Sequence, residues 1–204
     1  MTRAADIPVS HVQWQSAVRI IRSVFPPIDL FEDIAEPEDW PLLISAEQKT
    51  NPRLMETIGN IDLVPSARRV RGQGASYLMA PFTHASTDRP SRFSDGTLGV
   101  LYIANDFETA VHETAHHNGM FMAATRQEAG WLSQFRELLM DVDATLHDLR
   151  GTGQDYAAAL DPDDYRQAQG MATDLRAAGS DGIVYPKASR PKPESRRIPT
   201  RMIL

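Results

Sequence analysis

A run of His and Glu residues is the part of the chain best suited to chemistry. His112, Glu113 and His116 spell H-E-x-x-H, and on a helix this spacing puts two imidazoles on one face, as zinc hydrolases require. A third metal ligand must follow. The longer form of the motif finds Gly119 in place but Met122 where its last His belongs. A zinc-dependent hydrolase that uses this motif therefore stays an alternative rather than the leading interpretation.

The elements that would position these residues follow from local signals. Asn105 and Glu108 form a capping box, which predicts a helix from Asp106 to about Ala123. Acidic residues 161–164 open another helix, which Gly179 closes. Short apolar runs bounded by turn residues predict strands. These runs are Ala75 to Ala80, Gly99 to Ala104, Leu138 to Thr145 and Gly182 to Tyr185.

The amino-terminal part has a different pattern. Ser10 can cap a helix that ends at Pro26, and its apolar residues have the three- and four-residue spacing of a buried stripe. Residues 36–59 contain three prolines, which favours short, broken helices. We therefore expect a helical extension over residues 1–60 and a domain with a mixed sheet over residues 61–204. The predicted fold class is α+β.

Composition limits the possible partners and locations. The 204-residue chain has a formal net charge of -6, which argues against direct binding of nucleic acid. It has no cysteine, so thiol nucleophiles and thiolate metal sites are excluded. The apolar runs are too short to span a membrane, and the first residues lack the apolar core of a signal peptide, so we expect a cytoplasmic protein. Basic residues gather only at 68–71 and 187–201, where they could form a pocket for a small polyanion.

Several landmarks in the second half of the chain resemble the RES domain. Residues 91–94 resemble its G-R-[WF]-[NS] turn, residues 100–104 its V-x-Y-x-A strand, and residues 110–113 the A-x-x-E of the following helix. Residues 71–76 resemble the R…G-x-G-A opening of the family, and residues 182–190 resemble its late G-[IL]-x-[VY]-P-S segment. The resemblance covers about residues 65–204.

This resemblance implies a fold and an activity. RES domains have a fold like that of ADP-ribosyltransferase toxins and are toxins of toxin–antitoxin pairs. They act on NAD⁺ as substrate, by hydrolysis, by phosphorolysis or by transfer of ADP-ribose to a protein. The resemblance therefore implies an NAD⁺-consuming enzyme without a metal, whose partner is an Xre-type antitoxin that covers the active site. The acceptor of ADP-ribose, which is a protein, water or phosphate, is left open.

The resemblance also assigns roles to individual residues. Glu113 would hold the ribose hydroxyls and stabilise the developing positive charge. Arg71 and Arg92 would bind the pyrophosphate, with Arg68 or Arg69 as substitutes for Arg71. Tyr102 would stack on nicotinamide. Ser189 would be the fourth catalytic member, although it stands two residues later than the serine of the family pattern.

Two other interpretations stay open at this point. Glu113 could be a surface residue that pairs with His117 one helical turn later. The chain could also be a binding protein that uses the RES scaffold without activity; the presence of Arg92, Tyr102 and Glu113 together argues for an enzyme.

Overall fold

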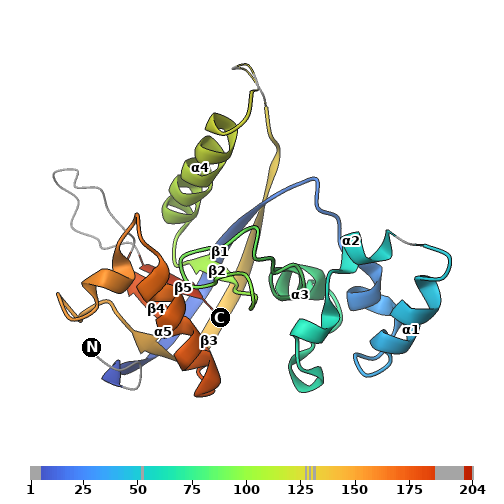
Figure 1. Cartoon of the computed structure of the whole chain (residues 1–204), viewed down its shortest axis with the longest axis horizontal. Helices are drawn as coiled ribbons and strands as arrows, with labels where there is room; N and C mark the ends of the chain where they lie inside the picture. The colour runs from blue at the N-terminus through green and yellow to red at the C-terminus, as the bar shows by residue number, and fades with distance from the viewer. Residues whose placement is uncertain are drawn as a thin grey trace. The chain divides into compact units, whose positions relative to one another are not determined.

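The computed structural model describes residues 6–51, 53–126, 128, 130, 132–186 and the backbone of 200–203. The chain divides into two compact units (Figure 1). One comprises Met1–Phe25 and Tyr102–Leu204, and the other comprises Pro26–Leu101. The first unit is built on a sheet and the second on short helices, so the α+β class predicted from the sequence is confirmed.

A mixed sheet forms the first unit. Within the described residues its strands follow the order β1-β2-β5-β4-β3 and close on themselves, because β1 pairs with both β2 and β3. The β3–β4 pair is parallel and the other pairs are antiparallel. The strands are β1 (Val9–Arg22), β2 (Tyr102–Ala104), β3 (Phe135–Asp148), β4 (Ile183–Pro186) and β5 (Thr200–Ile203). The strands predicted near residues 102, 140 and 184 are thus confirmed.

The helix predicted to begin at Ser10 is wrong, because this segment is β1. Its partner is β3, which lies more than a hundred residues later in the chain. Trp14 and Ala17 pair with Val142 and Met140, so β1 carries one extra residue between them, a β-bulge. Val142 and Met140 are two residues apart and share a face of the sheet, and therefore so do Trp14 and Ala17. The bulge thus produces a three-residue apolar spacing that imitates a helix.

The strand predicted for Ala75 to Ala80 is also wrong. These residues begin helix α3 (Ala75–Thr83). Gly74 precedes the helix with a left-handed backbone, and the carboxylate of Glu32 accepts hydrogen bonds from the backbone N–H groups of Gly74 and Ser76 at 2.8 and 3.1 Å. The group that caps this helix thus comes from a distant part of the chain, which a local pattern cannot reveal.

Two longer helices complete the first unit. Helix α4 (Phe107–Ala123) has nearly the predicted bounds, but its cap is Asp106 and not Asn105, since the Asp106 carboxylate accepts from the N–H of Thr109 at 2.8 Å. Helix α5 (Arg166–Ala177) is followed by Gly179, as predicted. Figure 1 shows α4 beside the long β1, on which it packs. No helix among the described residues is both long and apolar enough to cross a membrane.

The second unit packs short helices around Phe31 and Trp40. Both side chains are fully buried, and their rings lie 4.9 Å apart. The predicted broken helices are confirmed as α1 (Trp40–Glu47) and α2 (Leu54–Ile58). The remaining helical segments are η2 (Leu30–Ile34), η3 (Ile61–Leu63), η4 (Ser66–Arg68) and, in the first unit, η5 (Ala157–Leu160). The boundary predicted at residue 60 falls inside this second unit. Whether residues 61–204 form a catalytic domain by themselves stays a prediction.

Candidate active site

Helix α4 carries Glu113, and the helix packs on strands β1 and β2 of the sheet. Ala110, one turn before Glu113, is buried in a cluster with Val18 of β1 and Ala104 of β2. The small Ala side chains let the helix approach the two strands closely. The Glu113 side chain is 19% exposed, whereas that of Glu108 on the same helix is 86% exposed. Glu113 is therefore held at the sheet while Glu108 stands in solvent.

Arg19 of β1 is a residue of this site that the sequence reasoning missed. Its guanidinium Nη1 donates a hydrogen bond to the carbonyl oxygen of Tyr102 at 3.0 Å. Burial lowers the pKa of Arg19 to about 10, and the negative charge of Glu113 acts in the opposite direction. The side chain is thus still protonated at neutral pH. A charged residue between Val18 and Ile20, in an apolar run, was the signal that could have singled it out.

One hydrogen-bond donor of the Arg19 guanidinium is unused. Its Nε is buried and has no hydrogen-bond partner in the part of the chain that the structure describes. Leaving such a donor unsatisfied costs free energy, so it is a place where an anionic group could bind. Arg19, Tyr102 and Glu113 come from β1, β2 and α4 of the same unit, and these three elements pack against one another.

The histidines of α4 each lie near a carboxylate one turn earlier. His117 Nε2 is 3.6 Å from Glu113 Oε1, and His112 Nε2 is 3.6 Å from Glu108 Oε1. The two imidazoles of the H-E-x-x-H motif lie on a largely exposed helix. Among the described residues, no group of three or more His, Asp or Glu side chains is placed to hold a metal ion.

The predicted arginines of the phosphate clamp lie in the other unit. Arg71 Nη1 forms an ion pair with Glu36 Oε1 at 2.7 Å. Arg69 is no substitute for it, because its guanidinium is buried and donates to the carbonyl oxygen of Val64 at 3.0 Å. Arg92 is half-buried in the tight turn at residues 91–94. Ser189 lies outside the described residues.

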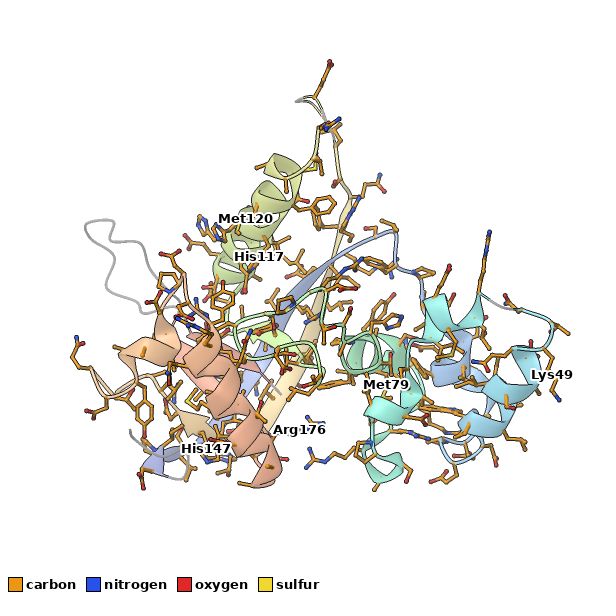
Figure 2. The ribbon with its side chains drawn as sticks, viewed as in Figure 1. Lys49, Met79, His117, Met120, His147 and Arg176 are labelled. Atoms are coloured by element: carbon orange, nitrogen blue, oxygen red, sulfur yellow. The ribbon has the colours of Figure 1, made fainter. Side chains whose placement is uncertain are left out.

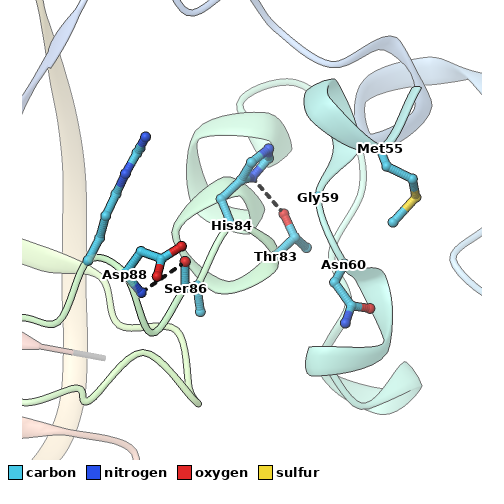
Figure 3. A pocket seen from close by; sticks show the side chains of 9 residues that line it. Met55, Gly59, Asn60, Thr83, His84, Ser86 and Asp88 are labelled. Atoms are coloured by element: carbon cyan, nitrogen blue, oxygen red, sulfur yellow. Dashed lines mark hydrogen bonds between the residues drawn. The ribbon is translucent and has the colours of Figure 1, made fainter. Parts of the chain in front are cut away.

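A cavity of about 420 Å³ lies within the second unit (Figure 3). His84 is held there by Thr83 Oγ1 and the carbonyl oxygen of Ala80, each 3.1 Å from its Nδ1. None of the residues predicted for catalysis lines the cavity, so we assign it no part in the chemistry. Its lining consists of Met55, Gly59, Asn60, Thr83, His84, Ala85, Ser86, Asp88 and Arg89.

Comparison with known proteins agrees with the resemblance described above. The chain is 27% identical over 173 residues to an uncharacterized protein, y4oC, of Sinorhizobium fredii, an alignment that covers 85% of this chain and 70% of that protein. The family model of the RES domain matches residues 66–195, which include Arg71, Arg92, Tyr102, Glu113 and Ser189. RES domains are NAD-acting enzymes associated with toxin–antitoxin systems. Because the match covers well over half of the chain, the protein belongs to the RES-domain family.

Proposed function

We propose that this protein cleaves NAD⁺ at the bond between nicotinamide and ribose and transfers the ADP-ribose to an acceptor. The observation that supports this most directly is the Arg19 guanidinium, which has a buried, unused donor at Nε and whose pKa responds to the negative charge of Glu113. A carboxylate suits the reacting ribose, and a guanidinium suits an anionic part of the same substrate.

The reaction requires stabilisation of a positive charge. As the bond from C1′ of the ribose to the nicotinamide nitrogen breaks, both electrons leave with nicotinamide, which becomes neutral, and C1′ becomes electron-deficient. The acceptor then adds to C1′ and loses a proton. The ionised carboxylate of Glu113 stabilises the charge at C1′ and accepts a hydrogen bond from a ribose hydroxyl. Its limited exposure to water strengthens this interaction.

The remaining residues bind the substrate. In our proposal Arg19, through its Nε, contacts the pyrophosphate, and the ring of Tyr102 stacks on nicotinamide. The role of Arg92 in binding the pyrophosphate rests on the resemblance to the family pattern alone. Arg71 takes part only if NAD⁺ displaces Glu36 from its guanidinium. Ser189 completes the site by resemblance to the family pattern.

We also propose a toxin role with an Xre-type antitoxin as partner. The supporting observation is the surface of α4, on which Val111, Met120 and Phe121 are 38%, 59% and 59% exposed. Apolar side chains that stand in solvent on the helix that carries Glu113 suit a partner protein that covers this helix. The acceptor of ADP-ribose, which is a protein, water or phosphate, is the part of the proposal that the following assay identifies.

The test is release of nicotinamide from NAD⁺ by the purified chain, measured alone, with phosphate and with cell extract. Glu113→Gln should reduce release at least a hundredfold. Glu108→Gln is the matched control, because Glu108 lies on the same helix with a His at the same distance but stands in solvent. It should retain the rate within twofold. The addition that accelerates release identifies the acceptor.

The zinc hydrolase makes a different prediction for the same preparation. It requires one Zn²⁺ per chain and a hydrolytic activity that His112→Ala abolishes. Stoichiometric zinc in elemental analysis, together with no release of nicotinamide under any condition, would replace the NAD⁺ proposal with this alternative.

A further inference from the structure

The cavity of the second unit is the basis of an inference that does not depend on the proposed function. Its volume of about 420 Å³ is within the range of small-molecule binding sites in proteins. Gly59 and Thr83 are buried and form its inner part, whereas Asn60, His84 and Asp88 stand at its solvent-exposed edge. All the lining residues belong to the same unit, so the cavity is complete within it.

Two short helices hold the inner part of the cavity. Helix α3 ends at Thr83, and Met79 of the same helix, labelled in Figure 2, is buried in the core of this unit. Gly59 follows α2, and its backbone lies so close to the carbonyl of Thr83 that an added Cβ would collide with it. The N–H of Asn60 donates a hydrogen bond to the same carbonyl oxygen at 2.7 Å. The two helices are thus joined at this point, and the fold fixes the inner part of the cavity.

Most polar groups of the lining already have partners within the chain. Asn60 Oδ1 accepts from the backbone N–H of Asp62 at 3.0 Å. Ser86 Oγ accepts from the backbone N–H of Asp88 at 3.2 Å. In contrast, the carboxylate of Asp88 and the guanidinium of Arg89 form no ion pair or hydrogen bond with each other or with any other residue that the structure describes. The cavity therefore offers one negative and one positive group to a ligand.

A tight turn fixes the point from which these two charged side chains leave the backbone. The N–H of Arg89 donates to the carbonyl oxygen of Ser86 at 2.9 Å, which closes the turn. Gly96 packs on the same carbonyl, where an added Cβ would collide with it. Because the turn is held by a hydrogen bond and by close packing, Asp88 and Arg89 start from fixed, adjacent positions.

The opposite end of the cavity is apolar. Figure 3 shows Met55 at one end and Asp88 at the other, with Thr83 and His84 between them. Met55 is half-buried, and its flexible thioether side chain adapts to apolar groups of different shape. The cavity thus has a charged end and an apolar end.

We propose that this cavity binds a free α-amino acid with a long apolar side chain. The carboxylate of the ligand accepts hydrogen bonds from the Arg89 guanidinium, its ammonium group donates to the Asp88 carboxylate, and its side chain lies toward Met55. A ligand with a single charge fits less well, because one of the two charged residues would attract it and the other would repel it. The two charges of the cavity thus select a zwitterion.

Isothermal titration calorimetry of the full chain with L-leucine tests the proposal, and saturable heat is expected. N-acetyl-L-leucine lacks the ammonium group and L-leucinamide lacks the carboxylate. Each should bind about tenfold more weakly than L-leucine, because one charge-assisted hydrogen bond is lost. Glycine lacks the apolar side chain and should also bind about tenfold more weakly.

Substitutions assign the binding to the cavity. Asp88→Asn and Arg89→Gln should each weaken the binding of L-leucine about tenfold. In Arg89→Gln, L-leucine and L-leucinamide should bind equally, because the partner of the carboxylate is gone. Glu47→Gln and Arg53→Gln are the matched controls, since both residues are exposed in the same unit and neither lines the cavity. These two variants should retain the affinity of the wild type within about twofold. Circular dichroism should show that all four variants are folded.

Four results would contradict the proposal. Absence of saturable heat with L-leucine overturns it, and so does unchanged affinity in both Asp88→Asn and Arg89→Gln. An equal loss of affinity in the control variants also overturns it, since the effect would then come from the net charge of the unit. If N-acetyl-L-leucine or L-leucinamide binds as tightly as L-leucine, the proposal is wrong and the cavity recognises one end of a peptide. None of these results bears on the release of nicotinamide, so the proposed function stands or falls by its own assay.

Discussion

Replacement of Arg19 by Met should stabilise the protein while it abolishes cleavage of NAD⁺. Arg19 is a half-buried charged residue whose Nε is buried and has no partner in the described part of the chain, which is an unfavourable arrangement for folding. Met has a similar length and no charge, so it can fill the same space. The substitution separates the role of the guanidinium in function from its effect on stability.

The magnitude follows from the pKa of Arg19. Burial lowers it from the ordinary value of arginine to about 10, against the opposing effect of Glu113. At 1.36 kcal/mol per pKa unit, the folded state holds this charge at a cost of about 3 kcal/mol. Because the folded pKa lies below the unfolded one, the cost is fully present below pH 10 and disappears as the pH rises toward the ordinary pKa of arginine.

Part of this gain is lost again in the variant. Met cannot donate to the carbonyl oxygen of Tyr102, and the lost hydrogen bond costs about 1 kcal/mol. The net stabilisation at neutral pH should therefore be about 1–2 kcal/mol, equivalent to a rise in Tm of about 3–6 °C for a chain of this length. Release of nicotinamide should fall at least a hundredfold, because the pyrophosphate loses its buried donor.

Thermal and urea unfolding of Arg19→Met and the wild type measure the first effect, and release of nicotinamide measures the second. Arg22→Met is the control on the same strand, since Arg22 is exposed, and its stability should change by less than about 0.5 kcal/mol. If Arg19→Met is destabilised by more than 1 kcal/mol, the guanidinium stabilises the fold and the reasoning from its burial is wrong. If the variant is more stable but fully active, Arg19 has no part in the site.

Three further predictions concern the fold. Gly59→Ala should destabilise the protein by about 2–4 kcal/mol in urea unfolding, because Gly59 has a φ of +75° and an added Cβ would collide with the backbone carbonyl of Thr83. Gly170→Ala, by contrast, should raise stability by about 0.5–1 kcal/mol, since this Gly lies within α5 with open space around it. Burial raises the pKa of Asp148, but hydrogen bonds, chiefly from Arg150, outweigh this effect and lower the pKa from 3.8 to about 2. The stabilisation that the ionised carboxylate gives to the fold is present above pH 4 and is lost between pH 4 and 2. Asp148→Asn should therefore be less stable than the wild type at pH 7, and its free energy of unfolding should depend less on pH below pH 4.

The sequence by itself determined the elements whose signals are local. The sequence predicts helix α4 because the signals for its start are encoded within a few residues, and Glu113 is therefore placed on a helix as well. Strand β2 with Tyr102, strand β4 and the broken helices before residue 60 follow from equally short patterns of apolar and turn residues. The resemblance to the RES domain depends on these same segments, and the family match confirms it.

Only the tertiary structure decided the elements that depend on distant partners. Residues 9–22 form a strand because β3 supplies their hydrogen bonds. A bulge between Trp14 and Ala17 interrupts the alternation of inward and outward side chains by which a strand is recognised in a sequence. The start of α3 depends in the same way on Glu32. Arg19 could not be assigned to the site before β1 was known to lie beside β2 and α4. The physical reason is common to all three: hydrogen bonding and burial between segments far apart in the chain leave no regular pattern within either segment.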